Sequence, residues 1–357
     1  MKTYGHSGRP PIEIDGSLGE GGGQVLRSSL ALSLITRIPF AIKNIRRRRP
    51  KPGLMAQHLK AVEAAAAVGA ACIEGASLGS QCLTFEPTAV VPGDFRFNIG
   101  TAGSTSLVLQ TLLCPLSLAR KGSTILINGG THVPWSPSFD FLALHWLPYM
   151  SQIGFDIQLE LRAAGFYPRG GGCVRAVVNP IKALAPLQLK ERGVLKRIRG
   201  ISAVANLNVS IAERQKAQAL KRLSSISPYL EIEIRHLSSP SRGTFLLLLA
   251  EFEHSQCCFC GLGARGKPAE RVADEAVDEL RDFLASDGAV DPYLADQLVL
   301  PLALAGGMSE IRTSRVTPHL VTNAEIVKMF LPVAIEVDQK IGRAGMVCIK
   351  GRCSHAA

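Results

Sequence analysis

The spacing of apolar and polar residues predicts a chain of short strands and buried helices. Long apolar segments at Gln24–Thr36 and Thr105–Leu118 predict two helices that are buried on most sides. Each follows a short segment with strand-like alternation, at Ile12–Asp15 and Asp94–Ile99. A glycine-rich turn joins strand to helix in both cases. The pattern therefore predicts two similar strand–turn–helix units, each of about 85 residues, as in an internal repeat.

Further elements follow within these two units. The Ala-rich segment His58–Val68 and the segment Phe139–Ile153 predict helices. Strands are predicted at Phe40–Ile45, Cys72–Glu74, Leu83–Glu86, Thr124–Asn128, Asp156–Leu161 and Cys173–Val178.

The composition changes near Leu187, where charged residues become frequent. This part contains an amphipathic helix at Ala212–Ser224 and a charged helix at Ala269–Leu284. Its strands are predicted at Glu231–Arg235 and Thr244–Glu251. From Tyr293 the Ala/Leu-rich character returns, with helices at Leu294–Ala305 and Asn323–Phe330 and a strand at Glu310–Arg312. We therefore predict an α/β protein in which residues 1–186 and 286–357 form the core and residues 187–285 form a smaller inserted α/β domain.

Composition and charge limit the class of protein. Apolar residues make up 46% of the 357 residues, which excludes a mainly disordered chain. The 40 lysines and arginines exceed the 29 acidic residues by 11, which favours an anionic partner, with nucleic acid as the first candidate. The sequence has neither a signal-like N-terminus nor a run of about 18 apolar residues. We therefore predict a cytoplasmic protein with no membrane partner.

The nine cysteines do not form the pattern of a disulfide scaffold. Single cysteines such as Cys72, Cys82 and Cys114 are interpreted as small buried hydrophobes. Cys257, Cys258, Cys260 and nearby His254 leave a zinc site open as the lesser alternative to a cysteine-bearing strand, because no second pair with CxxC-type spacing exists. Cys353 and His355 belong to a polar tail.

The first glycine turn and a run of arginines are candidates for phosphate binding. A glycine turn that opens a helix presents free backbone N–H groups to an anion, although it can also serve packing alone. Glu20 lies in this turn, and Arg27, seven residues later, is predicted to share a helix face with it. The run Arg46–Lys51 follows a strand, and prolines stiffen it, so it can present guanidinium groups to phosphates or remain a solvated face. Gln57 and His58 are predicted to open the next helix.

His319 is the candidate nucleophile. It follows Pro318, and Thr322 and Asn323 are predicted to cap the helix that comes after it. An imidazole can attack phosphorus and form a phosphoramidate, whereas the alternative is a histidine satisfied by a backbone carbonyl. No P-loop, kinase, GxSxG or HExxH motif is present, so a less common phosphate chemistry is indicated.

Six short motifs occur in order along the chain. They are Glu20–Arg27, Lys51–Leu59, Gly100–Gln110, Gly165–Gly172, Tyr293–Gln297 and His319–Asn323. As an ordered set, spanning nearly the whole chain, they resemble the motifs of the RNA 3′-terminal phosphate cyclases. The resemblance implies a core of three repeated α/β units, each like the C-terminal domain of bacterial translation initiation factor three, with a smaller α/β domain inserted.

The resemblance also implies a reaction and its site. In such a reaction the enzyme is adenylated on a histidine by ATP with a divalent metal, Mg²⁺ or Mn²⁺. AMP passes to the 3′-phosphate of RNA, and the 2′-hydroxyl then forms a 2′,3′-cyclic phosphate and releases AMP. His319 matches the adenylated histidine, and Glu20 matches the residue that holds metal beside ATP. Phosphate-contacting positions match Arg27, Arg46, Arg49 and Gln57, and nucleotide-pocket positions match Gln110, Pro137, Tyr293, Asp296 and Gln297.

The sequence departs from the family pattern at some positions, and two other functions remain open as alternatives. Arg47, Arg48 and Pro50 stand where the family usually has other residues, and His132 stands where Asp or Asn is expected. A non-catalytic cyclase-like protein of ribosome assembly is one alternative, although such proteins lack the histidine. An enolpyruvyl transferase, built from similar repeated units, is another. The resemblance leaves the oligomeric state open, with a homodimer as one alternative.

Overall fold

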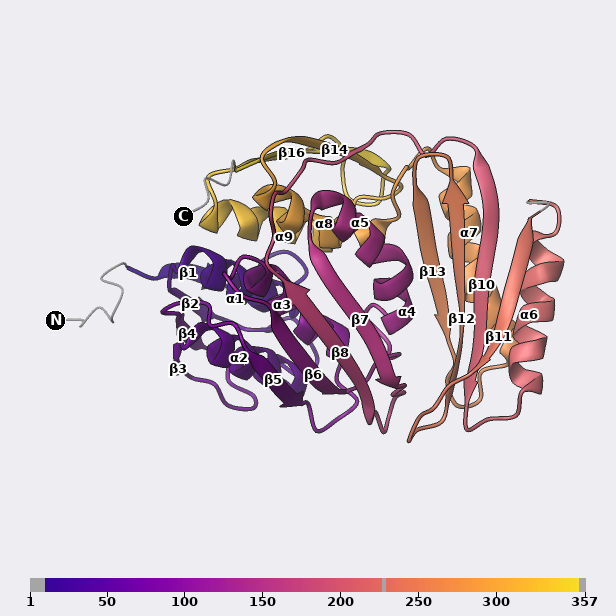
Figure 1. The fold of residues 1–357 in the computed structure, drawn as a ribbon, viewed down its shortest axis with the longest axis horizontal. Coiled ribbons are helices and arrows are strands. Elements are labelled where there is room, and N and C mark those ends of the chain that lie inside the picture. Colours follow the sequence, from indigo (N-terminus) through magenta and orange to yellow (C-terminus); the bar gives the residue numbers. More distant parts are fainter. Residues whose placement is uncertain (1–9, 227–228, 353–357) are drawn as a thin grey trace.

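The computed structural model describes residues 10–226 and 229–352, and its strands form four four-stranded sheets (Figure 1). The first sheet has the order β1-β2-β4-β3, in which β1 and β2 are parallel and the other pairs are antiparallel. Its elements are β1 (Ile12–Asp15), α1 (Gln24–Thr36), β2 (Phe40–Lys43), α2 (Ala56–Gly69), β3 (Cys72–Glu74) and β4 (Leu83–Glu86).

Two further sheets repeat this arrangement, with one parallel pair followed by two antiparallel pairs. Their strand orders are β5-β6-β8-β7 and β9-β14-β16-β15. The second is formed by β5 (Asp94–Asn98), α3 (Thr105–Ser117), β6 (Ser123–Gly129), α4 (Phe139–Phe141), a π-helical segment (Leu142–Trp146), α5 (Leu147–Ile153), β7 (Asp156–Ala163) and β8 (Gly172–Asn179). The third is formed by β9 (Gln188–Leu189), α8 (Pro292–Leu304), β14 (Gly307–Thr313), α9 (Pro318–Phe330), β15 (Ala334–Val337) and β16 (Gly345–Gly351).

The fourth sheet, β11-β10-β12-β13, stands beside the other three in Figure 1. It has its own apolar cluster, and α7 packs on β12 and β13. Its elements are β10 (Leu195–Ala205), α6 (Ser210–Leu223), β11 (Leu230–His236), β12 (Gly243–Phe252), β13 (Gln256–Leu262) and α7 (Ala269–Ala285). We call β10 to α7 the inserted unit. Because β9 pairs with β14 of the third sheet, we propose that the insertion begins after Leu189 and not at residue 187.

The helices of the first three units pack against one another, which explains their composition. α1 contacts α2, α3 and α9, and α8 contacts α9. A helix surrounded by other helices and a sheet has little exposed surface, so α1, α3 and α8 are apolar on nearly every side. Strands such as β6 alternate between buried and half-buried residues because one face of the sheet covers these helices.

Several predictions of local structure need correction. The predicted helix at Phe139–Ile153 consists of three segments, one of them π-helical. β10 was not predicted, because the charges of its first half (Lys196, Arg197 and Arg199) hide the apolar second half that the sheet buries. Cys72 and Cys82 are exposed and not buried. Cys353, His355 and the first nine residues lie outside the described residues. Within the described part, no helix is both long and apolar enough to cross a membrane.

Candidate active site

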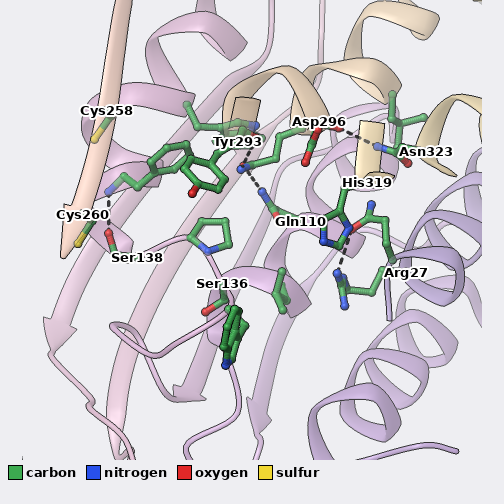
Figure 2. Close-up of a pocket in the computed structure, with 18 of the residues that line it drawn as sticks. Arg27, Gln110, Ser136, Ser138, Cys258, Cys260, Tyr293, Asp296, His319 and Asn323 are labelled. Atoms are coloured by element: carbon green, nitrogen blue, oxygen red, sulfur yellow. Dashed lines mark hydrogen bonds between the residues drawn. The ribbon is translucent and has the colours of Figure 1, made fainter. Parts of the chain in front are cut away.

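A cavity of about 690 Å³ lies between the helices of the core and one edge of the fourth sheet. Its walls come from α1, α3, α8 and α9, from the loop at residues 135–138, and from β13 on the opposite side (Figure 2). Residues of α7 also line it. Seven of the predicted site residues line it: Arg27, Gln110, Pro137, Tyr293, Asp296, Gln297 and His319. Residues from distant parts of the chain therefore meet in one cavity of a size that suits a nucleotide.

His319 lies in the first turn of α9. The helix begins at Pro318, and the Thr317 hydroxyl accepts a hydrogen bond from the Leu320 N–H at 2.9 Å. The prediction that Thr322 and Asn323 cap this helix is therefore wrong, because Thr317 is the cap and proline is favoured in the first helical position. This placement brings the imidazole to the end of the helix where free N–H groups favour an anion.

The surroundings of His319 keep its imidazole neutral. Burial lowers its pKa below the usual value, and the charges of Arg27 and Arg49 lower it further, while Glu20 opposes them. The His319 Nδ1 lies 3.3 Å from Glu20 Oε1. A neutral ring that directs its Nδ1 proton toward this carboxylate has its Nε2 lone pair available. The arrangement is therefore suited to a nitrogen nucleophile.

Glu20 connects His319 to the run of arginines. Its carboxylate accepts a hydrogen bond from Arg49 and is largely buried. Glu20 precedes α1 and is not part of it, so the predicted shared helix face with Arg27 is wrong, although the two charges do interact. Burial lowers the pKa of Arg27 to about 10, so this guanidinium remains charged at neutral pH. Arg27 and Arg49 thus lie close to His319 and to one carboxylate, so cationic groups gather at this end of the site, while Glu275, Asp278 and Glu279 also line the cavity.

The other arginines of the run have different partners. Arg46 donates hydrogen bonds to the carbonyl oxygens of Lys51 and Gly53, at 2.7 and 2.9 Å, and so closes its own loop. Arg48 donates to the Gly19 carbonyl at 3.1 Å and ties the run to the first glycine turn. Only part of the basic run therefore faces the site, although all of it was a candidate for phosphate contact.

Two glycines of the first turn let charged side chains approach the backbone. A Cβ at Gly22 would lie 2.1 Å from Glu20 Oε1, and one at Gly23 would lie 2.4 Å from His58 Nε2. Burial, with the charges of Arg27 and Arg46, lowers the pKa of His58 to about 3, so this second histidine is neutral and packs under the turn. A side chain at Gly22 would collide with Glu20 and Arg49, and one at Gly23 would collide with His58 and Arg27.

Helix α8 supplies the other side of the cavity. Asp291 caps it, and Gln297 donates to the Tyr293 carbonyl at 3.0 Å while accepting a hydrogen bond from Gln110. The Tyr293 hydroxyl donates to Glu279 of α7, so the inserted unit orients this ring. These contacts place an aromatic ring and two amides in one wall of the cavity (Figure 2).

Several residues of the site were not predicted. Asn323 donates to the Asp296 carbonyl at 2.8 Å and accepts from Ser28, which links α9 to α8 and α1. Gln24 donates to Ser28 and accepts from Arg27, both at 2.9 Å. Gln24 and Asn323 lie inside predicted motifs, so their polar character in buried segments was a usable signal. Glu279 carries no such signal, because an acidic residue on an amphipathic helix is usually solvated.

Four predicted residues, namely Glu20, Arg46, Arg49 and Gln57, stand beside the cavity lining and not in it. The Gln57 side chain accepts a hydrogen bond from the Ser104 N–H at 3.1 Å, so it connects α2 to the second glycine turn. The cysteine cluster lies on β13, and the described residues contain no group of three metal-ligating side chains. The alternative of a zinc site at these cysteines therefore has no support.

Asp296 provides a prediction about stability. Burial raises the pKa of its carboxyl to about 8, although a hydrogen bond from Thr317 partly opposes this. The folded state then holds a proton that the unfolded state, with a pKa near 3.8, releases, so stability falls as pH rises from about 4 to 8. Asp296→Asn removes this dependence. We expect the variant to gain stability relative to the parent across this range, by more than about 1 kcal/mol at pH 8.

Thermal unfolding of both proteins between pH 4 and pH 9 measures this difference. Asp287→Asn, at an exposed aspartate paired with Arg312, is the control and should show no such gain. A constant difference between Asp296→Asn and the parent over the whole range would show that Asp296 is ionised in the folded protein.

The fold and the site define an α/β protein with a nucleotide-sized cavity that contains a histidine beside a carboxylate and two arginines. A model of the family described as RNA 3′-terminal phosphate cyclase matches residues 18–337. The chain belongs to this family. A relative from Ralstonia nicotianae, named RNA 3′-terminal phosphate cyclase, is 47% identical over 92% of this chain and 94% of its own length. A relative of the same name from Thermococcus kodakarensis is 43% identical over 94% of this chain and 96% of its own length.

A likeness to a solved structure is much weaker. The enolpyruvyl transferase NikO from Streptomyces tendae is 10% identical, with a TM-score of 0.39, over 96% of this chain and 49% of that chain. The family membership confirms the resemblance found in the sequence motifs.

Proposed function

We propose that this protein converts the 3′-terminal phosphate of RNA into a 2′,3′-cyclic phosphate with consumption of ATP. The observation that carries the proposal is the place of His319: a neutral imidazole at a helix N-terminus, 3.3 Å from Glu20, near Arg27 and inside a nucleotide-sized cavity. The family name of the relatives agrees with this chemistry.

The first step transfers AMP to the enzyme. His319 Nε2 attacks the α-phosphorus of ATP, a P–N bond forms, and the bond to the β-phosphate oxygen breaks to release pyrophosphate. Glu20 then faces the imidazolium ring through Nδ1 and stabilises its charge. Arg27 and Arg49 neutralise charge on the phosphates, which such a transfer needs more than acid–base catalysis.

The second and third steps act on RNA. An oxygen of the RNA 3′-phosphate attacks the same phosphorus, the P–N bond breaks, and AMP is joined to the RNA end. The neighbouring 2′-hydroxyl attacks the 3′-phosphorus, loses its proton, and expels AMP to leave the cyclic phosphate. When the P–N bond breaks, its electron pair returns to Nε2 while Nδ1 keeps its proton, so His319 is regenerated as a neutral ring.

The walls of the cavity suit an adenine nucleotide. Tyr293 and Pro137 offer flat surfaces to a base, and Gln110 and Gln297 offer amides to its polar edge. Glu20 fits a divalent ion, because Mg²⁺ and Mn²⁺ are commonly held by one carboxylate together with substrate phosphates. Such an ion would neutralise charge on the phosphates of ATP.

Two other functions have less support. A cyclase-like protein without catalysis would not need a nucleophilic histidine in the cavity, and an enolpyruvyl transferase forms no covalent bond between histidine and a nucleotide. The presence and environment of His319 favour the cyclase over both.

A direct assay tests the proposed reaction. A short RNA with a 3′-phosphate, incubated with the protein, ATP and Mg²⁺, should gain an end that resists phosphatase until acid opens the cyclic phosphate. The same RNA with a 3′-hydroxyl should remain unchanged. If folded protein leaves the 3′-phosphate sensitive to phosphatase, with either Mg²⁺ or Mn²⁺, the proposed function is wrong.

A further inference from the structure

Trp135 stands at the mouth of the cavity with almost its whole side chain in water. It is 99% exposed, yet it belongs to the lining of the cavity that contains His319. Its backbone φ is 63°, in the left-handed region that bulky residues rarely adopt. No aromatic or cation–π contact of Trp135 occurs within residues 10–226 and 229–352. A strained, unpartnered indole beside a reactive group points to a ligand that covers it.

The loop that carries Trp135 is held firmly at its base. The N–H groups of Thr131 and His132 both donate to the Gly165 carbonyl, at 2.8 and 3.1 Å, and the Phe139 N–H donates to the Thr131 carbonyl at 2.9 Å. Pro134 and Pro137 flank the tryptophan and restrict the loop further. The exposed position of the indole is therefore built into the loop, so binding there would cost little ordering.

His132, which departs from the residue expected at its position, anchors this loop. Its ring lies between those of Phe166 and Phe245, with centroid distances of 5.3 and 4.6 Å. Its Nε2 lies 2.7 Å from Asp140 Oδ2, and its Nδ1 lies 2.8 Å from the Thr131 hydroxyl. Because Phe245 belongs to β12, the histidine fixes the loop against the inserted unit.

A second exposed aromatic residue and an exposed cation lie on the adjacent turn at residues 165–171. This turn pairs with the tryptophan loop through the bridge between His132 and Phe166. Tyr167 is 68% exposed, and Arg169 is exposed and has no ion pair in the part of the chain that the structure describes. Tyr167 and Arg169 do not line the cavity themselves, but the turn that carries them is joined to the loop that carries Trp135.

We propose that the rim of the cavity at Trp135, together with the adjoining turn that carries Tyr167 and Arg169, binds the last nucleotides of single-stranded RNA, with Trp135 stacked on a base and Arg169 on a backbone phosphate. The inference rests on the proposed function and assigns the place of its RNA substrate. Aromatic rings bind bases of single strands by stacking, without regard to sequence, and cations bind the backbone. The net charge of +11 fits the same partner.

The experiment measures RNA binding and adenylation by ATP separately, in the full-length protein. Binding of a fluorescent ten-nucleotide RNA with a 3′-phosphate is measured by anisotropy over a range of salt concentrations, and adenylation is measured with labelled ATP in the absence of RNA. Trp135→Ala should weaken RNA binding about 5- to 100-fold with an unchanged salt slope, and Trp135→Phe should restore most of the affinity. Arg169→Ala should reduce the magnitude of the salt slope by about 0.7. Val194→Ala and Lys182→Ala, at exposed positions outside the cavity lining, are the matched controls.

RNAs that lack a single base, at each of the last three nucleotides in turn, identify the stacked base. With the RNA that lacks the stacked base, Trp135→Ala should cause no further loss of affinity. Removing the base and the indole together should then weaken binding no more than removing either one alone. The proposal is overturned if Trp135→Ala binds all RNAs as the parent does, or if its defect is equal for every abasic RNA. It is also overturned if Trp135→Ala lowers ATP affinity as much as RNA affinity, which would place the indole in the nucleotide site. Failure of the parent protein to be adenylated would count against the proposed function and not against this rim.

Discussion

His319→Ala is expected to abolish covalent labelling of the protein by ATP that is labelled at the α-phosphate, with a loss of at least about a thousandfold in cyclisation. The side chain removed is the only imidazole among the described residues that line the cavity, and alanine offers no nucleophile. In the parent protein the label should be released by acid and resist alkali, as expected of a phosphoramidate. Gel autoradiography after each treatment measures this.

His254→Ala is a suitable control, because this histidine is exposed on the inserted unit and does not line the cavity. It should be labelled as well as the parent. Normal labelling of His319→Ala would show that another residue accepts AMP. The adenylation rate of the parent should rise with pH through a midpoint below 6.5 and then level off, because the lowered pKa of His319 leaves the ring neutral at neutral pH.

Glu20→Gln is expected to slow adenylation by about a hundredfold and to raise the concentration of divalent ion needed for half-maximal rate. Glutamine has nearly the same shape and can still accept the hydrogen bond from Arg49, but it carries no charge for a metal ion or for the imidazolium. The measurement is the adenylation rate as a function of Mg²⁺ and of Mn²⁺ concentration.

The same variant should move the pH midpoint of adenylation to a lower value. Glu20 raises the pKa of His319, so its neutralisation lets burial and the two arginines lower that pKa further. Glu63→Gln, which breaks a surface pair with Lys60, is the control and should change neither property. If Glu20→Gln has the metal dependence of the parent, Glu20 does not hold the metal.

Local sequence pattern was sufficient for much of the fold. The bounds of α1 and of β1, β3 and β4 match the prediction, because these segments have clear apolar spacing and end at glycine, proline or charged residues. β10 and the start of α9 were missed for a common reason. In both, a contact with a distant element outweighs the local pattern: the second half of β10 packs in the main apolar core through Ile201, Ala203 and Ala205, and Thr317, which also donates to Asp296 of α8, caps α9.

The sequence by itself determined the family, the chemical types at the site and His319 as the nucleophile to test, since these depend on residue identity and order. The tertiary structure alone decided which charges face one another. It placed Glu20 between His319 and Arg49, turned Arg46 and Arg48 toward backbone carbonyls, and brought Ser28 to Asn323, 295 residues away. It also made the inserted unit a wall of the cavity through Glu279. Such contacts arise when helices and sheets from separate parts of the chain pack together, and no local pattern records which faces will meet.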